Sequence, residues 1–223
     1  MVAERLSIVV PALNEASRIG ACLEALAALR ERGHEVIVAD GGSTDETPAL
    51  AVGRCDRVVQ SPRGRAVQMN AGARCASGDV LVFLHADSRL PSAADQLIIE
   101  AVKTSLWGRF DVDIEGRHPL LPLIAWSMNL RSRLSGIATG DQAIFVRRAA
   151  FPGFPEIALL EDVAFSKAMK RRGPPACLRE KVATSGRRWE SGGVLRTILL
   201  MWRLRLLYFL GASPETLARQ YDR

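Results

Sequence analysis

Acidic residues stand where three short apolar runs end in the N-terminal half of the chain. They are Glu15, Asp40 and Asp87. Each preceding run is rich in β-branched residues, as buried strands of a parallel sheet are. The carboxyl ends of parallel strands meet at one edge of a sheet, so these carboxylates should gather there although they are remote in sequence. Carboxylates placed in this way can accept hydrogen bonds from a ribose or a base, or hold a cation.

Asp87 is the sharpest local feature, because an apolar strand delivers His85-Ala86-Asp87 into a polar loop. Alternation places His85 and Asp87 on one side if the strand continues. A hard divalent cation prefers oxygen ligands, and a single carboxylate is enough where a diphosphate supplies the others. The alternative is structural: Asp87 caps a helix or starts a turn, and Asp40 occupies the turn before Gly41.

The elements that must position these groups are readable from periodicity. Strands are predicted over residues 6–10, 36–39, 58–59, 80–84, 110–114 and 143–146. Helices are predicted over 19–29, 66–76, 92–103, 120–134, 162–172 and 195–209. Ser43 with Glu46 fits a capping box, which predicts a further helix beginning near Thr44.

Strands that alternate with helices predict an α/β fold with a mostly parallel central sheet flanked by helices. A chain of 223 residues suits one domain, here 1–185, with a C-terminal helical extension over 186–223. The first strand is followed by Pro11-Ala12-Leu13-Asn14-Glu15 in place of G-x-G-x-x-G, which argues against dinucleotide binding.

Composition narrows the class of partner. The formal charge is +6, which suits a phosphorylated substrate or an anionic membrane. No basic run interleaved with aromatics is present, so nucleic acid is not expected. The four cysteines show no C-x-x-C spacing and are expected to be reduced and structural, as in a cytoplasmic protein. We find neither a signal peptide nor an uncharged apolar run of about 18 residues.

The apolar segment 194–211 is interrupted by Arg196, Arg203 and Arg205. Two interpretations are open. In one it is an interfacial helix on an anionic membrane, beside a lipid-linked acceptor at the inner face. In the other it packs on a second subunit, as in a homodimer, or on the apolar segment 119–130.

Ordered motifs then point to a family. The segments SIVVPALNE (7–15), VADGGSTD (38–45), RAVQMNAG (65–72) and LHAD (84–87) resemble family 2 glycosyltransferases, as do Gly140-Asp141-Gln142 and Glu161-Asp162. The wording FLHAD resembles a small bacterial subgroup whose genes lie near radical-SAM, selenium and arsenic genes. One position departs from the pattern: His85 stands where the family's DxD motif has its first acidic residue.

The resemblance implies a GT-A fold with a nucleotide-binding half (1–90) and an acceptor half (91–185), an NDP-sugar donor, and Mn²⁺ or Mg²⁺. It assigns residues to roles as follows. The donor site comprises Pro11, Ala12, Asn14, Glu15, Asp40, Gly41, Arg65, Asn70, His85 and Ala86. Asp87 is the metal ligand, and Asp162 with Glu161 is catalytic. The acceptor contacts are Gly140, Asp141, Gln142, Arg188 and Trp189.

The implied reaction moves a sugar to an acceptor hydroxyl, with Asp162 as the base and with inversion at the anomeric carbon. Without the other motifs, Glu161-Asp162 would read as a helix N-terminus favoured by the macrodipole. Two other functions share the acidic strand ends. One is a sugar-nucleotide nucleotidyltransferase, although the loop after the first strand offers only Arg18. The other is a non-catalytic, membrane-associated protein that binds nucleotide sugars.

Overall fold

The computed structural model describes residues 4–221 and contains one eight-stranded sheet, in the order β3-β2-β1-β4-β7-β6-β8-β5. Strand β1 is parallel to β2 and β4, and β2 is parallel to β3. Strand β7 runs antiparallel to β4 and β6, while β6 and β8 are parallel. The strands are β1 (Leu6–Ala12), β2 (Glu35–Asp40), β3 (Arg57–Gln60), β4 (Val80–Phe83), β5 (Ser88–Arg89), β6 (Trp107–Glu115), β7 (Phe145–Arg147) and β8 (Ala176–Ser185). The predicted α/β fold with a mostly parallel sheet is confirmed.

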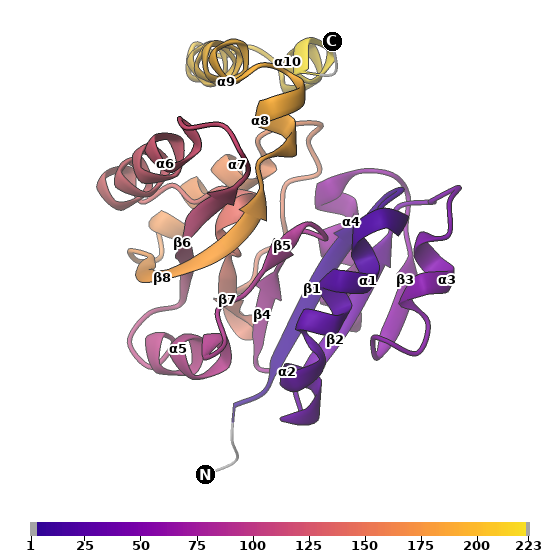
Figure 1. The fold of residues 1–223 in the computed structure, drawn as a ribbon. Coiled ribbons are helices and arrows are strands. Elements are labelled where there is room, and N and C mark those ends of the chain that lie inside the picture. The colour runs from indigo at the N-terminus through magenta and orange to yellow at the C-terminus, as the bar shows by residue number, and fades with distance from the viewer. Residues whose placement is uncertain (1–3, 222–223) are drawn as a thin grey trace.

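Helices cover both faces of this sheet (Figure 1). They are α1 (Ala16–Ala25), α2 (Ala27–Glu31), α3 (Thr47–Ala51), α4 (Arg65–Cys75), α5 (Ala94–Ala101), α6 (Leu121–Ser135), α7 (Glu161–Lys170), α8 (Arg187–Ser191), α9 (Val194–Phe209) and α10 (Pro214–Tyr221). Ile8 and Val10 of β1 face the core under α1, α2 and α5, whereas Val9 faces the core under α4 and α7. Burial on both faces explains why the strand reads as a continuous apolar run.

One local prediction was wrong, one strand ends a residue earlier than predicted, and one strand was missed. Helix α3 begins at Thr47 and not near Thr44, because the Ser43 hydroxyl donates to Asp40 Oδ1 (2.5 Å) and does not cap a helix. Strand β4 ends at Phe83, so His85 and Asp87 lie in the following turn. Strand β8 was missed altogether, because its middle residues are charged and exposed and show no apolar alternation.

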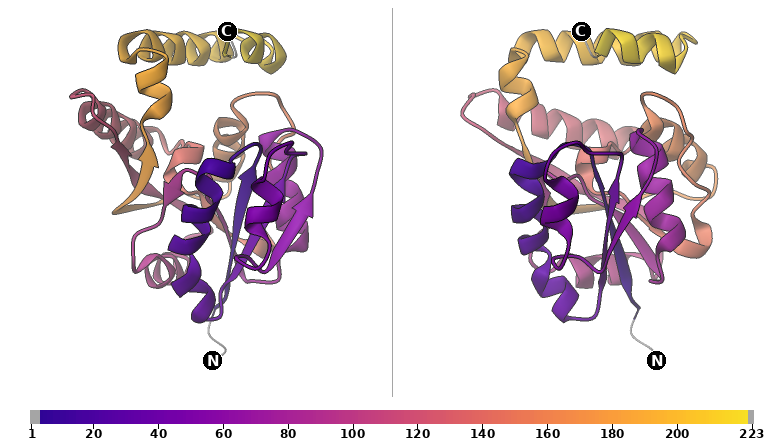
Figure 2. Two further views of the ribbon diagram at one scale, coloured as in Figure 1. Left: turned by 45° about the vertical axis from the view of Figure 1, so that its right-hand side comes forward. Right: turned by 90° about the vertical axis from the view of Figure 1, so that its right-hand side faces the viewer.

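The C-terminal helices cross the edge of the sheet where β1 and β4 end (Figures 1 and 2). Val194 and Ile198 of α9 pack with Ile124 and Met128 of α6. Packing on segment 119–130 is therefore confirmed, although Trp202 and other large apolar residues of α9 remain exposed. Within residues 4–221, no helix has the length and apolarity that crossing a membrane requires.

Candidate active site

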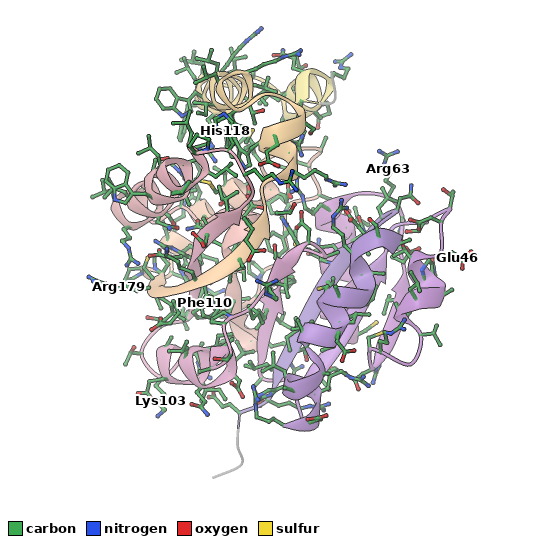
Figure 3. The ribbon with its side chains drawn as sticks, in the orientation of Figure 1. Glu46, Arg63, Lys103, Phe110, His118 and Arg179 are labelled. Atoms are coloured by element: carbon green, nitrogen blue, oxygen red, sulfur yellow. The ribbon has the colours of Figure 1, made fainter. Side chains whose placement is uncertain are left out.

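Two adjoining cavities of about 530 and 470 Å³ open at the edge where β1 and β4 end. Both are lined by Glu15, Arg65, His85, Asp87, Arg188 and Tyr221. Glu15 and Asp87 come from the loops after β1 and β4, as predicted from the strand ends. In Figure 3 the labelled Arg63 rises from the same edge, and its side chain lines the smaller cavity.

The loop after β1 is tied to the loop after β2 by side-chain to backbone hydrogen bonds. Asn14 adopts a left-handed conformation (φ 55°), and its Oδ1 accepts from the Thr44 amide at 2.9 Å. Asp40 is 1% exposed, and its Oδ2 accepts from the amides of Gly42 (3.0 Å) and Ser43 (3.1 Å). Asn14 and Asp40 thus shape this rim, and neither lines the two cavities.

Gln68 is a residue of this site that the sequence analysis did not single out. Its amide nitrogen donates to the carbonyls of Ala12 (2.7 Å) and Ala39 (3.1 Å), which joins α4 to the ends of β1 and β2. A Cβ on Gly41 would stand 2.8 Å from Gln68 Cδ, so only glycine allows this approach. Gln68 also lines the smaller cavity. The available signal was a polar residue on the buried face of a helix.

Arg65 and Glu161 form an ion pair that links α4 to α7. Arg65 begins α4 after Gly64 (φ 143°), and its Nε lies 2.5 Å from Glu161 Oε1 in the first turn of α7. Glu161 is buried, whereas Arg65 is partly exposed and lines both cavities. Burial lowers the pKa of Arg65, but the carboxylates of Glu161 and Asp162 outweigh it and hold the pKa above its ordinary value. The guanidinium therefore stays charged and faces the cleft.

His85 is bound to Asp141, which explains how the departure from the acidic motif is accommodated. His85 Nδ1 lies 3.4 Å from Asp141 Oδ1. Burial lowers the pKa of His85, but Asp141 raises it more, and the net shift is upward. Burial raises the pKa of Asp141, but the hydrogen bond with His85 lowers it more, and the net shift is downward. His85 Nε2 is buried against Gly140, where a Cβ would approach within 2.5 Å, so this nitrogen is closed to a ligand.

Asp162 is held by backbone amides. Its Oδ2 accepts from Gly140 (3.0 Å) and its Oδ1 from Val163 (2.7 Å). It lies in the first turn of α7, is half-buried and lines neither of the two cavities. Asp87 lines both, so the structure brings Asp87, but not Asp162, directly to the cleft.

Two other predicted residues are structural. Gln142 is fully buried and completes a capping box with Thr139. The amide nitrogen of Asn70 donates to the carbonyl of Phe154 at 2.9 Å and positions the loop before α7. By contrast, Pro11 and Ala86 line the smaller cavity, which Asp87 also lines.

The C-terminal extension contributes directly to the cleft through Arg188 and Trp189, which the resemblance names as acceptor contacts, and through Tyr221, which the sequence did not single out. The guanidinium carbon of Arg188 lies 3.5 Å from the centre of the Tyr221 ring. Tyr221, on α10, lines both cavities, and Trp189 lines the larger one. Arginine-aromatic stacking of this kind holds α10 over the site.

The donor set fits a cation only in part. Among residues 4–221, no group of three His, Cys, Asp or Glu side chains is arranged to hold a metal ion. Asp87, Glu15 and Asp141 do line the larger cavity, but Glu15 is paired with Arg18 (2.8 Å) and Asp141 with His85. The residues therefore suit a divalent cation that takes Asp87 from the protein and oxygens from a substrate and water.

The fold and cleft define an α/β domain with an arginine- and carboxylate-lined site at the carboxyl edge of its sheet. The chain belongs to glycosyltransferase family 2, since the model of that family, "Glycosyl transferase family 2", matches residues 7–146.

A PGL/p-HBAD biosynthesis glycosyltransferase of Mycobacterium tuberculosis (strain ATCC 25618 / H37Rv) is 36% identical over 100 residues, 42% of this chain and 39% of the relative. An uncharacterized glycosyltransferase of the same organism, Rv0539, is 31% identical over 91 residues, 40% of each chain. The matches thus span about two fifths of the length of these curated relatives.

Solved structures share the GT-A fold. S. aureus TarS 1-349 superposes with a TM-score of 0.66 at 21% identity, over 82% of this chain and 60% of that chain. Glucosyl-3-phosphoglycerate synthase from Mycobacterium tuberculosis, in complex with Mn²⁺, UDP and glucosyl-3-phosphoglycerate, superposes with a TM-score of 0.61 at 18% identity. The superposition covers 81% of this chain and 71% of that chain. Mannosyltransferase PcManGT from Pyrobaculum calidifontis, in complex with GDP-Man and Mn²⁺, superposes with a TM-score of 0.59 at 22% identity. The superposition covers 82% of this chain and 57% of that chain.

Proposed function

We propose that this protein transfers a sugar from a nucleotide-diphosphate donor to an acceptor hydroxyl, with a divalent cation. The observation that carries the proposal is that Asp87 and Arg65 both line the same two cavities. One is a ligand for a cation on the diphosphate, and the other is a fixed positive charge beside it. Family membership and the Mn²⁺ complexes of the structural neighbours support the same chemistry.

The roles of the residues follow from their positions. Pro11 and Gln68 lie where the nucleoside would enter, and Arg65 and Arg63 would bind the diphosphate. Asp87 would hold the cation, which when bound neutralises charge growing on the diphosphate. A well-placed electrostatic contact to such a leaving group contributes about 3–4 kcal/mol to the barrier reduction.

Asp162 would accept the proton of the acceptor hydroxyl as its oxygen bonds to the anomeric carbon and the bond to the diphosphate breaks. A single displacement of this kind inverts the anomeric centre. Asp162 lines neither cavity and its Oδ2 accepts from the Gly140 amide, so the acceptor hydroxyl would have to approach this carboxylate beside Gly140. Catalytic contacts are often long before the substrate binds.

The nucleotidyltransferase alternative needs a basic loop after β1 that binds a triphosphate. Arg18, the cation available there, is committed to Glu15 at 2.8 Å. Titration calorimetry with UDP, GDP, UTP and GTP, with and without Mn²⁺, separates the functions. Tighter binding of diphosphates with the metal supports a transferase, whereas metal-dependent preference for triphosphates would refute it.

Turnover separates an enzyme from a binding protein. We expect Asp162→Asn to retain nucleotide affinity and lose transfer by at least about a hundredfold, the usual contribution of a general base. Asp113→Asn is the matched control, since the Asp113 side chain is half-exposed and its Oδ1 lies 3.6 Å from the exposed Lys181 Nζ. Donor hydrolysis across common sugar nucleotides supplies the assay, and equal rates in both variants would remove Asp162 from the base role.

Cytoplasmic location, a homodimer through α9 and membership of the subgroup near radical-SAM, selenium and arsenic genes stay predictions from the sequence. Contact with the inner face of a membrane also stays a prediction. It is supported by the row of exposed apolar residues on α9, including Leu199, Trp202 and Leu206. Flotation with anionic liposomes at low salt tests it.

A further inference from the structure

An apolar groove of about 460 Å³ lies between α6 and α9, next to the active-site cleft. Its walls include Ile124 and Met128 of α6 and Ile198 of α9. It joins the cleft directly, because Asp141, Trp189 and Met201 line both spaces. This volume lies in the range of small-molecule sites.

Arg131 and Arg205 also line this groove, together with Asp141, and among residues 4–221 neither arginine forms a salt bridge. Arg131 Nε and Nη2 and Arg205 Nε are buried with no hydrogen-bond partner within the described part of the chain. The remaining terminal nitrogen of Arg131 donates to the Ile137 carbonyl at a long 3.5 Å. Burial lowers the pKa of Arg131 to about 10, and the positive charge of Arg205 adds to the effect. Burial also lowers the pKa of Arg205, against the opposing charges of Asp162 and Asp141.

Buried guanidinium nitrogens without partners are costly, and an anion bound between the two side chains would offset that cost. The donor's diphosphate is a poor candidate for this anion. Arg63, Arg65 and Arg188 line the cavities where the donor would bind, whereas Arg131 and Arg205 line neither. The anion site therefore belongs to the other substrate.

We infer that the acceptor is a lipid with an anionic head group. The head group binds Arg131 and Arg205, and the apolar chain lies in the groove between α6 and α9. The inference rests on the proposed transferase function and names its substrate class. Leu123 is 58% and Trp202 70% exposed at the groove, which suits a chain that leaves toward an apolar surface. The head group lies beside Asp141 and near Asp162, where the acceptor oxygen is needed.

The test is calorimetry without nucleotide, using farnesyl phosphate, farnesol and inorganic phosphate below any micelle concentration. Farnesyl phosphate should bind at least tenfold more tightly than either fragment. Arg131→Gln and Arg205→Gln should each weaken the binding of farnesyl phosphate by at least tenfold and leave the affinity for farnesol unchanged. Arg203→Gln is the matched control, since it removes the same charge from an exposed position on α9.

A second variant tests the groove separately from the charges. Ser127→Trp should fill the groove, abolish the advantage of farnesyl phosphate over inorganic phosphate and keep the phosphate affinity. Circular dichroism confirms folding of each variant. Equal affinities for farnesol and farnesyl phosphate, or an equal loss in Arg203→Gln, would overturn the inference.

Titration of UDP with Mn²⁺ on the same samples separates this inference from the proposed function. If UDP binds and farnesyl phosphate does not, the transferase stands and the lipid acceptor fails. If farnesyl phosphate binds through the arginines and no nucleotide binds, the lipid site stands and the transferase fails.

Discussion

Replacing Arg65 by Met should destabilise the protein in a way that depends on pH. The substitution keeps the apolar stem of the side chain and removes the charge that lies 2.5 Å from Glu161. Burial raises the pKa of Glu161, the charge of Asp162 adds to the rise, and Arg65 opposes both. Without Arg65, the buried carboxyl must either stay ionised without a partner or take up a proton.

The cost of protonation sets an upper bound on the destabilisation. A glutamate with an unfolded pKa of about 4.3 costs about 1.4 kcal/mol to neutralise for each pH unit above that value. The bound is therefore about 3.7 kcal/mol at pH 7 and about 2.3 kcal/mol at pH 6. This range agrees with the ~3–5 kcal/mol that removing one partner of a buried ion pair costs.

The sign follows from linkage. In the variant the folded state binds a proton that the unfolded state releases above pH 4.3, so stability falls as pH rises. We expect a loss of about 2–4 kcal/mol at pH 7 that shrinks by up to about 1.4 kcal/mol per unit toward pH 5. Urea unfolding followed by circular dichroism from pH 5 to 8 measures it.

Two controls accompany the measurement. Arg63→Met removes an exposed arginine two residues away and should leave the pH profile unchanged. The double variant Arg65→Met/Glu161→Gln should recover most of the stability, since no unpaired charge remains, but not the transfer activity. A loss below about 0.5 kcal/mol at pH 8, the scale of an ordinary surface substitution, would refute the reasoning. So would a loss that does not change with pH.

Two further predictions concern groups around Asp87. Asp141→Asn should lower the pKa of His85, because burial and the charge of Arg65 then oppose only the smaller attraction of Asp87. NMR titration of the ring proton checks this shift, and an unmoved titration midpoint would contradict the ion pair. Burial, helped by the charges of Asp87 and Glu15, raises the pKa of Cys22 to about 12. Iodoacetamide at pH 8.5 should therefore label the half-buried Cys75 and spare Cys22 in the native protein, as measured by mass spectrometry; equal labelling rates would rule this out.

Much of the sheet could be predicted because its central strands are buried on both faces. Val9 and Ile37 face one helical layer while Ile8 and Val38 face the other, so no alternation is needed to recognise them. Strand β8 could not be predicted in this way, since its centre is charged and exposed. Its place beside β6 is decided by a pairing between segments about 70 residues apart.

The candidate site divides along similar lines. Asp87 and Glu15 could be predicted to meet because both follow parallel strands, and both line the same cavities. The partner of His85 could not be predicted, because Asp141 reaches it from a loop more than 50 residues later. The hydrogen bonds of Asp40 with the amides of Gly42 and Ser43 agree with the alternative that places Asp40 in the turn before Gly41, between which and a nucleotide contact its position at the end of a strand could not decide.

The sequence by itself determined the alternation of strands and helices, the edge at which the acidic residues gather and the family of the protein. These features depend on local periodicity and on motifs that are contiguous in the chain. The tertiary structure alone decided that α10 covers the cleft and that Arg131 and Arg205 face one apolar groove. Such contacts join segments that carry no local signal of each other, and only the packing of α9 over the sheet edge brings them together.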